Sequence, residues 1–544
     1  MHTGETPTSV TLQTELVEHL KGVLADLHAA DTVELLQTHI SYVLLAGHFA
    51  YKIKKAVDLG FLDFRTLSAR RHFCLEELRL NRRTAPNLYL DVVEISGPAQ
   101  SPVVSGTGPP LEYAVRMRRF ERNATLDRLL ELGRLDVCMI DAAADAMVAF
   151  HRSLAGAMPV GNQGSIPAIE EPTESNLACL SRHYALSANG NVLERHALWV
   201  AHQHAILRDA FVRRLADGHV RECHGDLHLA NIAWIDGSAV FFDCIEFDPN
   251  LRWIDVMSEL AFLAMDLQSR ARYDLSWRLI NRYLETTGDF AGMEVLRYYM
   301  AYRAMVRAKV ATLKAAQAMP DAVNDAERTA ANYLGLAETY AQPSSPAIVL
   351  THGLSGSGKS YLSERLSNLA GAIRLRSDIE RKRIHGLAAG DHSRGQVGSD
   401  LYGADATRST YLRLSEVVAH VVRCGYTVIV DAACLARWQR KLFLDLARRL
   451  SVPCVIVDLH ADLDVLRARV SARHAQGKDA SDADPGVLEQ QITSAEPLSP
   501  EELAIAVRVD WSASHLMSAP DVLWARIDAE FRRQRDLASL TAAT

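Results

Sequence analysis

A glycine-rich loop constrains this sequence more than any other feature. Residues 353–360 match the pattern G-x-x-x-x-G-K-[ST] and lie between an apolar run, 347–351, and a helical pattern that begins at Tyr361. Glycines let the backbone curl so that its N–H groups point at phosphates, which the N-terminus of the following helix also attracts. The predicted nucleotide-binding residues are Gly353, Leu354, Ser355, Gly356, Ser357, Gly358, Lys359 and Ser360. Lys359 is predicted to reach the terminal phosphates, and the Ser360 hydroxyl to bind Mg²⁺.

The chain around this loop alternates short apolar strands with helices. The runs 347–351, 427–430 and 454–459 are strand-like, and helical patterns separate them. Such alternation predicts an α/β domain with a parallel sheet, spanning 347–544.

Two carboxylates follow predicted strands of this domain. Asp378 comes after the second strand, at the edge where open α/β sheets gather their chemistry, and is a candidate base for the proton of an attacking hydroxyl. Asp431 ends the strand at 427–430 and is a candidate Mg²⁺ ligand. Either residue could instead cap a helix, and for Asp378 the two roles are compatible.

Two arginines follow the third strand at helical spacing. Arg469 and Arg473 are four residues apart and would share a helix face. They could close over the transferring phosphate as a lid, with the polar stretch 476–485 next to them, or form a solvated basic face. Their place after the third strand favours the lid.

Residues 347–533 resemble the AAA-type P-loop kinases, which include polynucleotide-kinase-like and small-metabolite kinases. The resemblance rests on the glycine-rich loop and on RSDIERKRIHG, GYTVIVDAACLARWQR and RARVSARHAQGKDASDA. It implies a nucleoside-monophosphate-kinase type of fold with a mobile lid. It also implies that Asp378 is the base on the substrate side, Arg381 a substrate or phosphate contact, and Arg469 and Arg473 lid residues.

A different phosphotransfer pattern occupies the first part of the chain. Residues 224–231 read HGDLHLAN, and Asp243 closes the apolar strand that follows. In protein kinases a loop of this kind supplies an Asp that receives the acceptor proton and an Asn that holds Mg²⁺, and a second metal-binding Asp comes shortly after. The sequence therefore predicts Asp226 as the catalytic base, with Asn231 and Asp243 as metal ligands.

A kinase-like small lobe also needs a strand lysine for the phosphates and a helix glutamate to hold it. Two strands are predicted at 41–45 and 49–54, and Lys52 and Lys54 point to the same face of the second one. Lys52 is the preferred lysine and Glu77 the preferred glutamate, with Lys54 and Glu76 as alternatives. The turn between these strands lacks a glycine-rich loop to cover phosphates.

These patterns predict two modules in order. A kinase-like domain covers 1–340, with a small lobe at about 28–117 and a helical lobe at about 123–340, and the Pro- and Ser-rich segment 341–346 is the linker. The first module resembles the aminoglycoside phosphotransferase-like branch of the protein-kinase fold, an α+β bilobal fold. Nearly the whole chain resembles the bacterial family of bifunctional proteins that join such a domain to a P-loop ATP-binding domain.

The composition of the chain limits the kinds of partner and the cellular location that we expect. Lys and Arg number 59 against 66 Asp and Glu, a formal charge of -7, which disfavours a surface that coats nucleic acid. Close Cys-x-x-Cys pairs are absent from the sequence, and so are apolar stretches long enough for a membrane helix. We therefore expect a cytoplasmic protein without a membrane span.

The leading hypothesis is an ATP-dependent kinase with two nucleotide-binding modules. Each would transfer the γ-phosphoryl group of Mg-ATP to a hydroxyl of a small-molecule acceptor. One alternative makes one module a nucleotide-dependent regulatory switch. Another lets the P-loop module act on a nucleic-acid end. The sequence leaves the acceptors and the oligomeric state open.

Overall fold

The computed structural model describes residues 9–60, 62–184, 188–317, 320–388, 403–476, 485–510 and 519–542. The chain forms two compact units, Met1–Ala178 with Arg208–Asp266, and Cys179–Leu207 with Leu267–Thr544. Helices that precede the expected linker therefore belong to the same unit as the P-loop sheet. Residues 341–346 stay a prediction for the boundary between modules.

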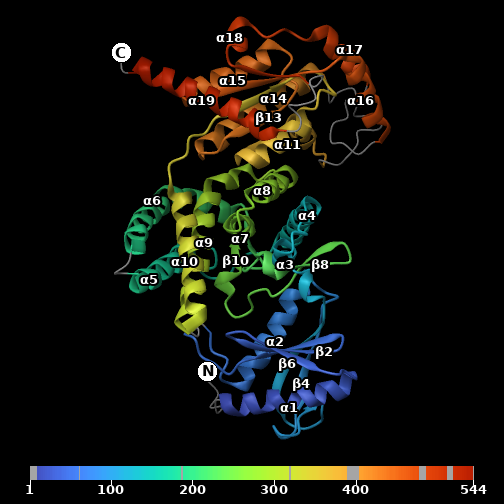
Figure 1. Cartoon of the computed structure of the whole chain (residues 1–544), viewed down its shortest axis with the longest axis vertical. Helices are drawn as coiled ribbons and strands as arrows, with labels where there is room; N and C mark the ends of the chain where they lie inside the picture. The colour runs from blue at the N-terminus through green and yellow to red at the C-terminus, as the bar shows by residue number, and fades with distance from the viewer. Residues whose placement is uncertain are drawn as a thin grey trace. The chain divides into compact units, whose positions relative to one another are not determined.

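The first unit begins with a six-stranded antiparallel sheet in the order β1-β2-β3-β6-β4-β5 (Figure 1). One face packs on α1 through Leu16, Leu20 and Leu24, and the other on α2 through Cys74. The elements are α1 (Val10–His28), β1 (Val33–Gln37), β2 (Ser41–Ala46), β3 (Phe49–Lys54), α2 (Leu67–Asn81), β4 (Tyr89–Ser96), β5 (Val103–Val104) and β6 (Pro110–Arg118).

The predicted hairpin of the small lobe is confirmed, since β2 pairs with β3 in antiparallel register around Gly47. Strand β1, which pairs with β2 across the short turn at 38–40, was not predicted. The turn at 38–40 contains no glycine.

The rest of the first unit is mainly helical, with two small antiparallel sheets. Strand β7 pairs with β10, and β8 pairs with β9. The loop that carries Asp226 lies between β7 and β8. The elements are η1 (Arg122–Ala124), α3 (Leu126–Glu131), α4 (Val137–Ser153), α5 (Ile166–Tyr184), α6 (Ala188–Ala216), β7 (Val220–Glu222), η2 (Leu229–Asn231), β8 (Ile232–Ile235), β9 (Ser238–Phe241), η3 (Pro249–Leu251), β10 (Trp253–Asp255) and α7 (Val256–Ser269). Helices α5 and α7 end in the second unit, and α6 begins in it.

The second unit is built on a five-stranded parallel sheet in the order β12-β13-β11-β14-β15. The central strands are buried along nearly their whole length, because helices cover both faces, and this explains their continuous apolar sequence. The strands are β11 (Ile348–His352), β12 (Ile373–Arg376), β13 (Val428–Asp431), β14 (Cys454–His460) and β15 (Ala506–Asp510).

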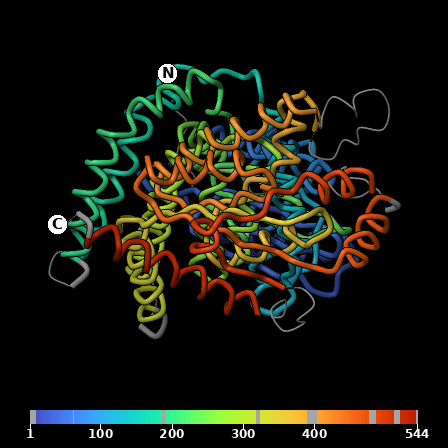
Figure 2. Tube along the Cα trace, turned by 90° about the horizontal axis from the view of Figure 1, so that it is seen from above, coloured from blue at the N-terminus to red at the C-terminus, as the bar shows by residue number. Residues whose placement is uncertain are grey.

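Helices α11 and α19 pack on one face through Leu362, Leu366, Leu523 and Phe531. Both views show α19, in red, running along the outside of this domain (Figures 1 and 2). The helices are α8 (Tyr273–Thr287), η4 (Phe290–Gly292), α9 (Met293–Gln317), α10 (Pro320–Ala341), α11 (Lys359–Ala370), α12 (Ser377–Ile384), α14 (Ala404–Arg423), α15 (Arg437–Leu450), α16 (Leu463–Gln476), α17 (Pro485–Ser494), α18 (Pro500–Leu503) and α19 (Pro520–Ala542). Among the described residues, no helix is long and apolar enough to cross a membrane.

Candidate functional site

The glycine-rich loop joins β11 to α11, as the sequence predicts. Gly353 has a φ of +146°, and a Cβ there would lie 2.7 Å from the carbonyl oxygen of Leu459, so only glycine fits this tight turn. The Lys359 ammonium folds back over the loop and donates to the carbonyls of Gly353 (2.9 Å) and Leu354 (2.8 Å). Burial lowers the pKa of Lys359 to about 8, against the opposing influence of Asp431 and Asp378.

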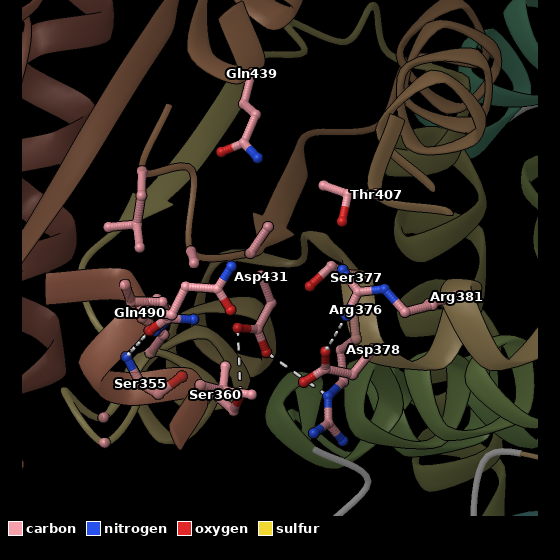
Figure 3. Close-up of a pocket in the computed structure, with 18 of the residues that line it drawn as sticks. Ser355, Ser360, Arg376, Ser377, Asp378, Arg381, Thr407, Asp431, Gln439 and Gln490 are labelled. Carbon is pink, nitrogen blue, oxygen red and sulfur yellow. Dashed lines mark hydrogen bonds and ion pairs between the residues drawn. The ribbon is translucent and has the colours of Figure 1, made fainter. Parts of the chain in front are cut away.

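Ser360 and Asp431 meet beside the loop (Figure 3). The Ser360 hydroxyl donates to Asp431 Oδ1 at 3.2 Å, and the Ser363 hydroxyl donates to Oδ2 at 3.0 Å. The Arg376 guanidinium lies 3.7 Å from the same carboxylate. A serine hydroxyl and a carboxylate are hard oxygen donors of the kind that Mg²⁺ selects, so these residues fit a magnesium ion.

Asp378 faces the same cavity from the first turn of α12. Its carboxylate lies 3.2 Å from Arg381 Nη1, so the two residues named for the substrate side are adjacent. The N-cap of α12 is Arg376, and Asp378 is therefore not the capping residue. The structure thus leaves this carboxylate available to the cavity (Figure 3).

One cavity of about 500 Å³ brings together most of the predicted P-loop residues. Its lining includes Ser355, Gly356, Gly358, Lys359, Ser360, Arg376, Ser377, Asp378, Arg381, Asp431, Arg469 and Arg473. Gly353, Leu354 and Ser357 belong to the same loop but are not in this lining. Arg469 and Arg473, the arginines predicted to form a lid, both come from α16, and Arg469 donates to the Gly356 carbonyl at 3.3 Å. Most of the adjoining polar stretch, 477–484, lies outside the described residues.

Helix α17 also contributes to this cavity, which was not predicted. Gln491 Oε1 accepts a hydrogen bond from the Ser355 N–H at 2.8 Å. Leu354 packs against a small apolar cluster that joins α16 to α17 through Val470 and Leu488. The pair Gln490-Gln491 was visible in the sequence, but its helix was not predicted to touch the loop because that contact joins segments far apart in the chain.

The kinase-like residues meet in the first unit. Lys52 Nζ lies 2.8 Å from Glu77 Oε1 and 2.5 Å from Asp243 Oδ1. Lys54 contacts the other oxygen of Glu77 at 2.5 Å and also pairs with Glu246. Burial opposes the charged form of Glu77, but Lys52 and Lys54 outweigh it and lower the pKa of Glu77 to about 2.

The contacts of Lys52 differ from those of Lys54, and the contacts of Glu77 differ from those of Glu76. Both lysines hold Glu77, but of the two it is Lys52 that reaches Asp243. Glu76 turns away and pairs with Arg79 and Arg252. Of the preferred residues, Lys52 therefore lies beside the predicted metal ligand, and Glu77 holds Lys52.

The loop with Asp226 is stabilised by hydrogen bonds of its own side chains. Asn231 Nδ2 donates to the Asp226 carbonyl at 2.9 Å and to its carboxylate at 3.2 Å. His224 Nε2 lies 2.8 Å from the Phe242 carbonyl and donates to it, because a carbonyl oxygen can only accept. Burial lowers the pKa of His224. The contacts bring Asp226 and Asn231 together, while Asp243 follows the strand β9.

Helix α7 holds this loop by a residue that the sequence analysis did not single out. Glu259 accepts hydrogen bonds from the N–H groups of His224 (2.6 Å) and Gly225 (3.0 Å) through one oxygen. Its other oxygen contacts His151 at 2.7 Å. Nothing in the local pattern of α7 marks Glu259, since its partners are distant in sequence.

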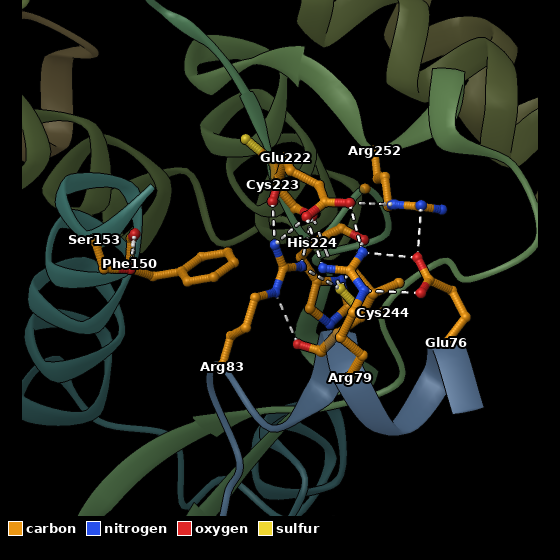
Figure 4. Close-up of polar contacts among 12 residues, drawn as sticks. Glu76, Arg79, Arg83, Phe150, Ser153, Glu222, Cys223, His224, Cys244 and Arg252 are labelled. Atoms are coloured by element: carbon orange, nitrogen blue, oxygen red, sulfur yellow. Dashed lines mark hydrogen bonds and ion pairs between the residues drawn. The ribbon is translucent and has the colours of Figure 1, made fainter. Parts of the chain in front are cut away.

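A network of ion pairs ties α2 to the segment just before the loop (Figure 4). Glu222 pairs with Arg79 (2.7 Å), Arg83 (3.3 Å) and Arg252 (3.1 Å). Arg252 also reaches Glu76 on α2 at 2.8 Å. The helix that presents Glu77 to Lys52 is therefore fixed to the strand that leads into the Asp226 loop.

Comparison with known proteins finds a family match in the P-loop part of the chain and relatives that match most of it. A family described as "AAA domain" matches residues 348–498. The uncharacterized protein Rv2004c of Mycobacterium tuberculosis is 30% identical over 453 residues, which cover 82% of this chain and 88% of the relative. An uncharacterized protein of Mycobacterium bovis, Mb2027c, matches to the same extent.

Among solved structures, a choline/ethanolamine kinase family protein from Mesorhizobium loti is similar over 60% of this chain and 99% of its own, with 13% identity and a TM-score of 0.36. A gluconokinase from Sinorhizobium meliloti covers 37% of this chain and 97% of its own, with 20% identity and a TM-score of 0.24. The first unit is α+β, with an antiparallel sheet followed by a mainly helical part, and the second has a P-loop and a parallel sheet, as predicted.

Proposed function

Because this chain belongs to the bacterial family that joins an aminoglycoside-phosphotransferase-like module to a P-loop ATP-binding module, we propose that both modules are ATP-dependent kinases. Each would transfer the γ-phosphoryl group of Mg-ATP to a hydroxyl of a small-molecule acceptor. The observation that carries the proposal is the single cavity that Lys359, Asp431 and Asp378 share.

In the P-loop module the proposed roles follow from position. The loop N–H groups and Lys359 would hold the phosphates, and Asp378 would accept the proton of the attacking hydroxyl. Magnesium, held through Ser360 and Asp431, would neutralise phosphate charge. Arg469 and Arg473 would supply fixed positive charge where negative charge develops during transfer.

In the first module Asp226 would be the base. Asn231 already contacts the Asp226 carboxylate, which supports a shared place for the metal ligand and the base. Asp243 would be the second metal ligand, and Lys52, oriented by Glu77, would contact the phosphates. Carboxylate and amide oxygens suit Mg²⁺ in this module too.

The experiment compares phosphorylated products formed from ATP and a metabolite extract by the full-length parent, Asp226→Ala and Lys359→Ala. We expect each variant to lose a different product, since each removes a residue central to one module. Lys441→Ala and Asp325→Ala, which alter exposed ion pairs, are the matched controls and should keep both products. A product pattern unchanged by Asp226→Ala would exclude a catalytic first module, and one unchanged by Lys359→Ala would exclude a catalytic P-loop module.

A further inference from the structure

Helix α8, which precedes the expected linker, contacts the acceptor side of the P-loop sheet within the second unit. It packs against β12 and α11 (Figure 1). Strand β12 is the edge strand of the parallel sheet, and Asp378 follows its last residue by two positions. Whatever fixes this strand therefore also fixes the candidate base.

Asn281 of α8 hydrogen-bonds to the backbone of β12 and of the residue before it, as a neighbouring strand would. Its side-chain amide donates to the Ala372 carbonyl at 3.0 Å and accepts from the Arg374 N–H at 2.7 Å. The residue is 4% exposed, so the loss of this amide would leave buried backbone groups without their partner. The Asn281 side chain thus provides hydrogen-bond partners for backbone groups at the edge of the sheet, where no further strand among the described residues pairs with β12.

Glu285, one turn further along α8, anchors the same strand by charge. Its carboxylate lies 2.7 Å from Arg374 Nε, and both side chains are 9% exposed. The other end of the Arg374 guanidinium donates to the Ser360 carbonyl at 3.3 Å. Arg374 therefore connects Glu285 both to the strand before Asp378 and to the serine that contacts Asp431.

The far end of α12 is held by the turn after α8. Arg383 donates to the Glu285 carbonyl at 2.6 Å, and its guanidinium lies 5.8 Å from the centre of the Phe290 ring. Gly288 has a φ of +74°, and a Cβ there would lie 2.7 Å from Arg383 Nε. Both ends of the segment 373–384, which carries Asp378 and Arg381, are therefore in contact with residues 281–290.

We propose that Asn281 and Glu285 are positioning residues for the P-loop reaction, which hold Asp378 at the distance from the phosphates that transfer requires. This inference rests on the proposed kinase function of the P-loop module. It means that the acceptor half of that site is built partly on a helix placed before the linker. Position matters in such a site because a shift of about 1 Å in a reacting group can cost about a hundredfold in rate.

The test uses Asn281→Asp and Glu285→Gln in the full-length chain, each combined with Asp226→Ala so that only the P-loop module can act. Both substitutions nearly preserve volume: the first removes the donor to Ala372, and the second removes the charge that Arg374 pairs with. Arg272→Gln, which alters a pair with Asp274 at the solvent-facing start of α8, is the matched control. Three quantities are measured: Mg-ATP affinity, amide hydrogen exchange, and Lys359-dependent phosphorylation of acceptors in a metabolite extract.

We expect Mg-ATP affinity to change by less than about twofold and kcat to fall by about tenfold or more, since binding and base position are held by different elements. Amides of 373–384 should exchange faster, while those of β11 and β14 keep their protection. The control should match the parent. An unchanged kcat, or faster exchange across the whole sheet together with weaker Mg-ATP binding, would overturn the positioning role.

Failure of the proposed function has a different signature. If the Asp226→Ala chain without further changes forms no Lys359-dependent product, the P-loop module is not a kinase. The exchange measurement still decides whether Asn281 and Glu285 fix the segment: selective loss of protection at 373–384 supports that part of the inference, and unchanged exchange overturns it.

Discussion

The two lysines proposed to bind phosphates, Lys52 and Lys359, lie in opposite electrostatic settings. Lys52 lies between the carboxylates of Glu77 and Asp243, and although burial opposes its charge, these acids raise the pKa of Lys52 well above its usual value. Lys359 instead contacts backbone carbonyls, and burial lowers its pKa to about 8. In the first module positive charge is fixed by side-chain ion pairs, and in the second by a loop of backbone groups.

The largest predicted effect of this difference is on stability. Replacing Lys52 should lower the free energy of unfolding more than replacing Lys359. Lys52→Met leaves buried Glu77 with one cationic partner fewer, so the free energy of unfolding should fall by about 3 kcal/mol. Lys359→Met removes a charge that burial already disfavours, so the free energy of unfolding should change by less than about 1 kcal/mol. Denaturant unfolding followed by a probe in each unit measures both.

Lys21→Met, which alters an exposed pair with Glu18, is the control for losing a lysine and should have little effect. Equal stability of Lys52→Met and the parent would contradict the contrast between the two settings.

The second prediction concerns magnesium in the P-loop module. Asp431→Asn keeps the shape of the side chain but removes the charge that Ser360 and Ser363 orient. The Mg²⁺ concentration that half-saturates Lys359-dependent transfer should rise by about 10- to 100-fold, because even residues that only orient metal ligands have effects of that size. Asp226-dependent transfer in the same chain is the internal control. An equal rise in the half-saturating Mg²⁺ concentration of both activities would show that the two sites are not independent.

The smallest predicted effect is the uptake of a fraction of a proton when Mg-ATP binds. With a pKa of about 8, part of the Lys359 population is neutral above that pH, and a bound phosphate favours the charged form, so its pKa rises on binding. Mg-ATP binding to the P-loop module should therefore take up a fraction of a proton near pH 8.5. Lys52, whose pKa is already raised, should take up none at that pH.

Calorimetric titration in buffers of different ionisation enthalpy measures this uptake. The Lys52→Met chain isolates the P-loop module, and the Lys359→Met chain isolates the first one. Uptake of equal size in both chains would mean that the pKa contrast between the lysines is wrong.

The sequence predicted the parts of each site that lie within short segments. The loop 353–360 and the HGDLHLAN loop, 224–231, each hold their chemistry in a few consecutive residues, so their patterns were readable. Strand alternation left Lys52 and Lys54 equivalent, and the structure shows why, since both contact Glu77.

What the sequence did not reveal depends on long-range contacts. Glu259 is distant in sequence from His224, and Glu285 is distant from Arg374, so local periodicity marked neither residue. Strand β1 was not predicted because its hydrophobic pattern is weak: four of its residues are half buried and Gln37 is exposed. Such positions become recognisable only after the elements have packed.

The central claim, two separate Mg-ATP sites in one chain, is tested most directly by counting bound nucleotides. Equilibrium dialysis with a slowly hydrolysed ATP analogue and Mg²⁺ gives the number bound per chain at saturation. We expect two for the parent, and one each for Lys52→Met and Lys359→Met. A single nucleotide bound by the parent, or loss of both on either substitution, would contradict the account.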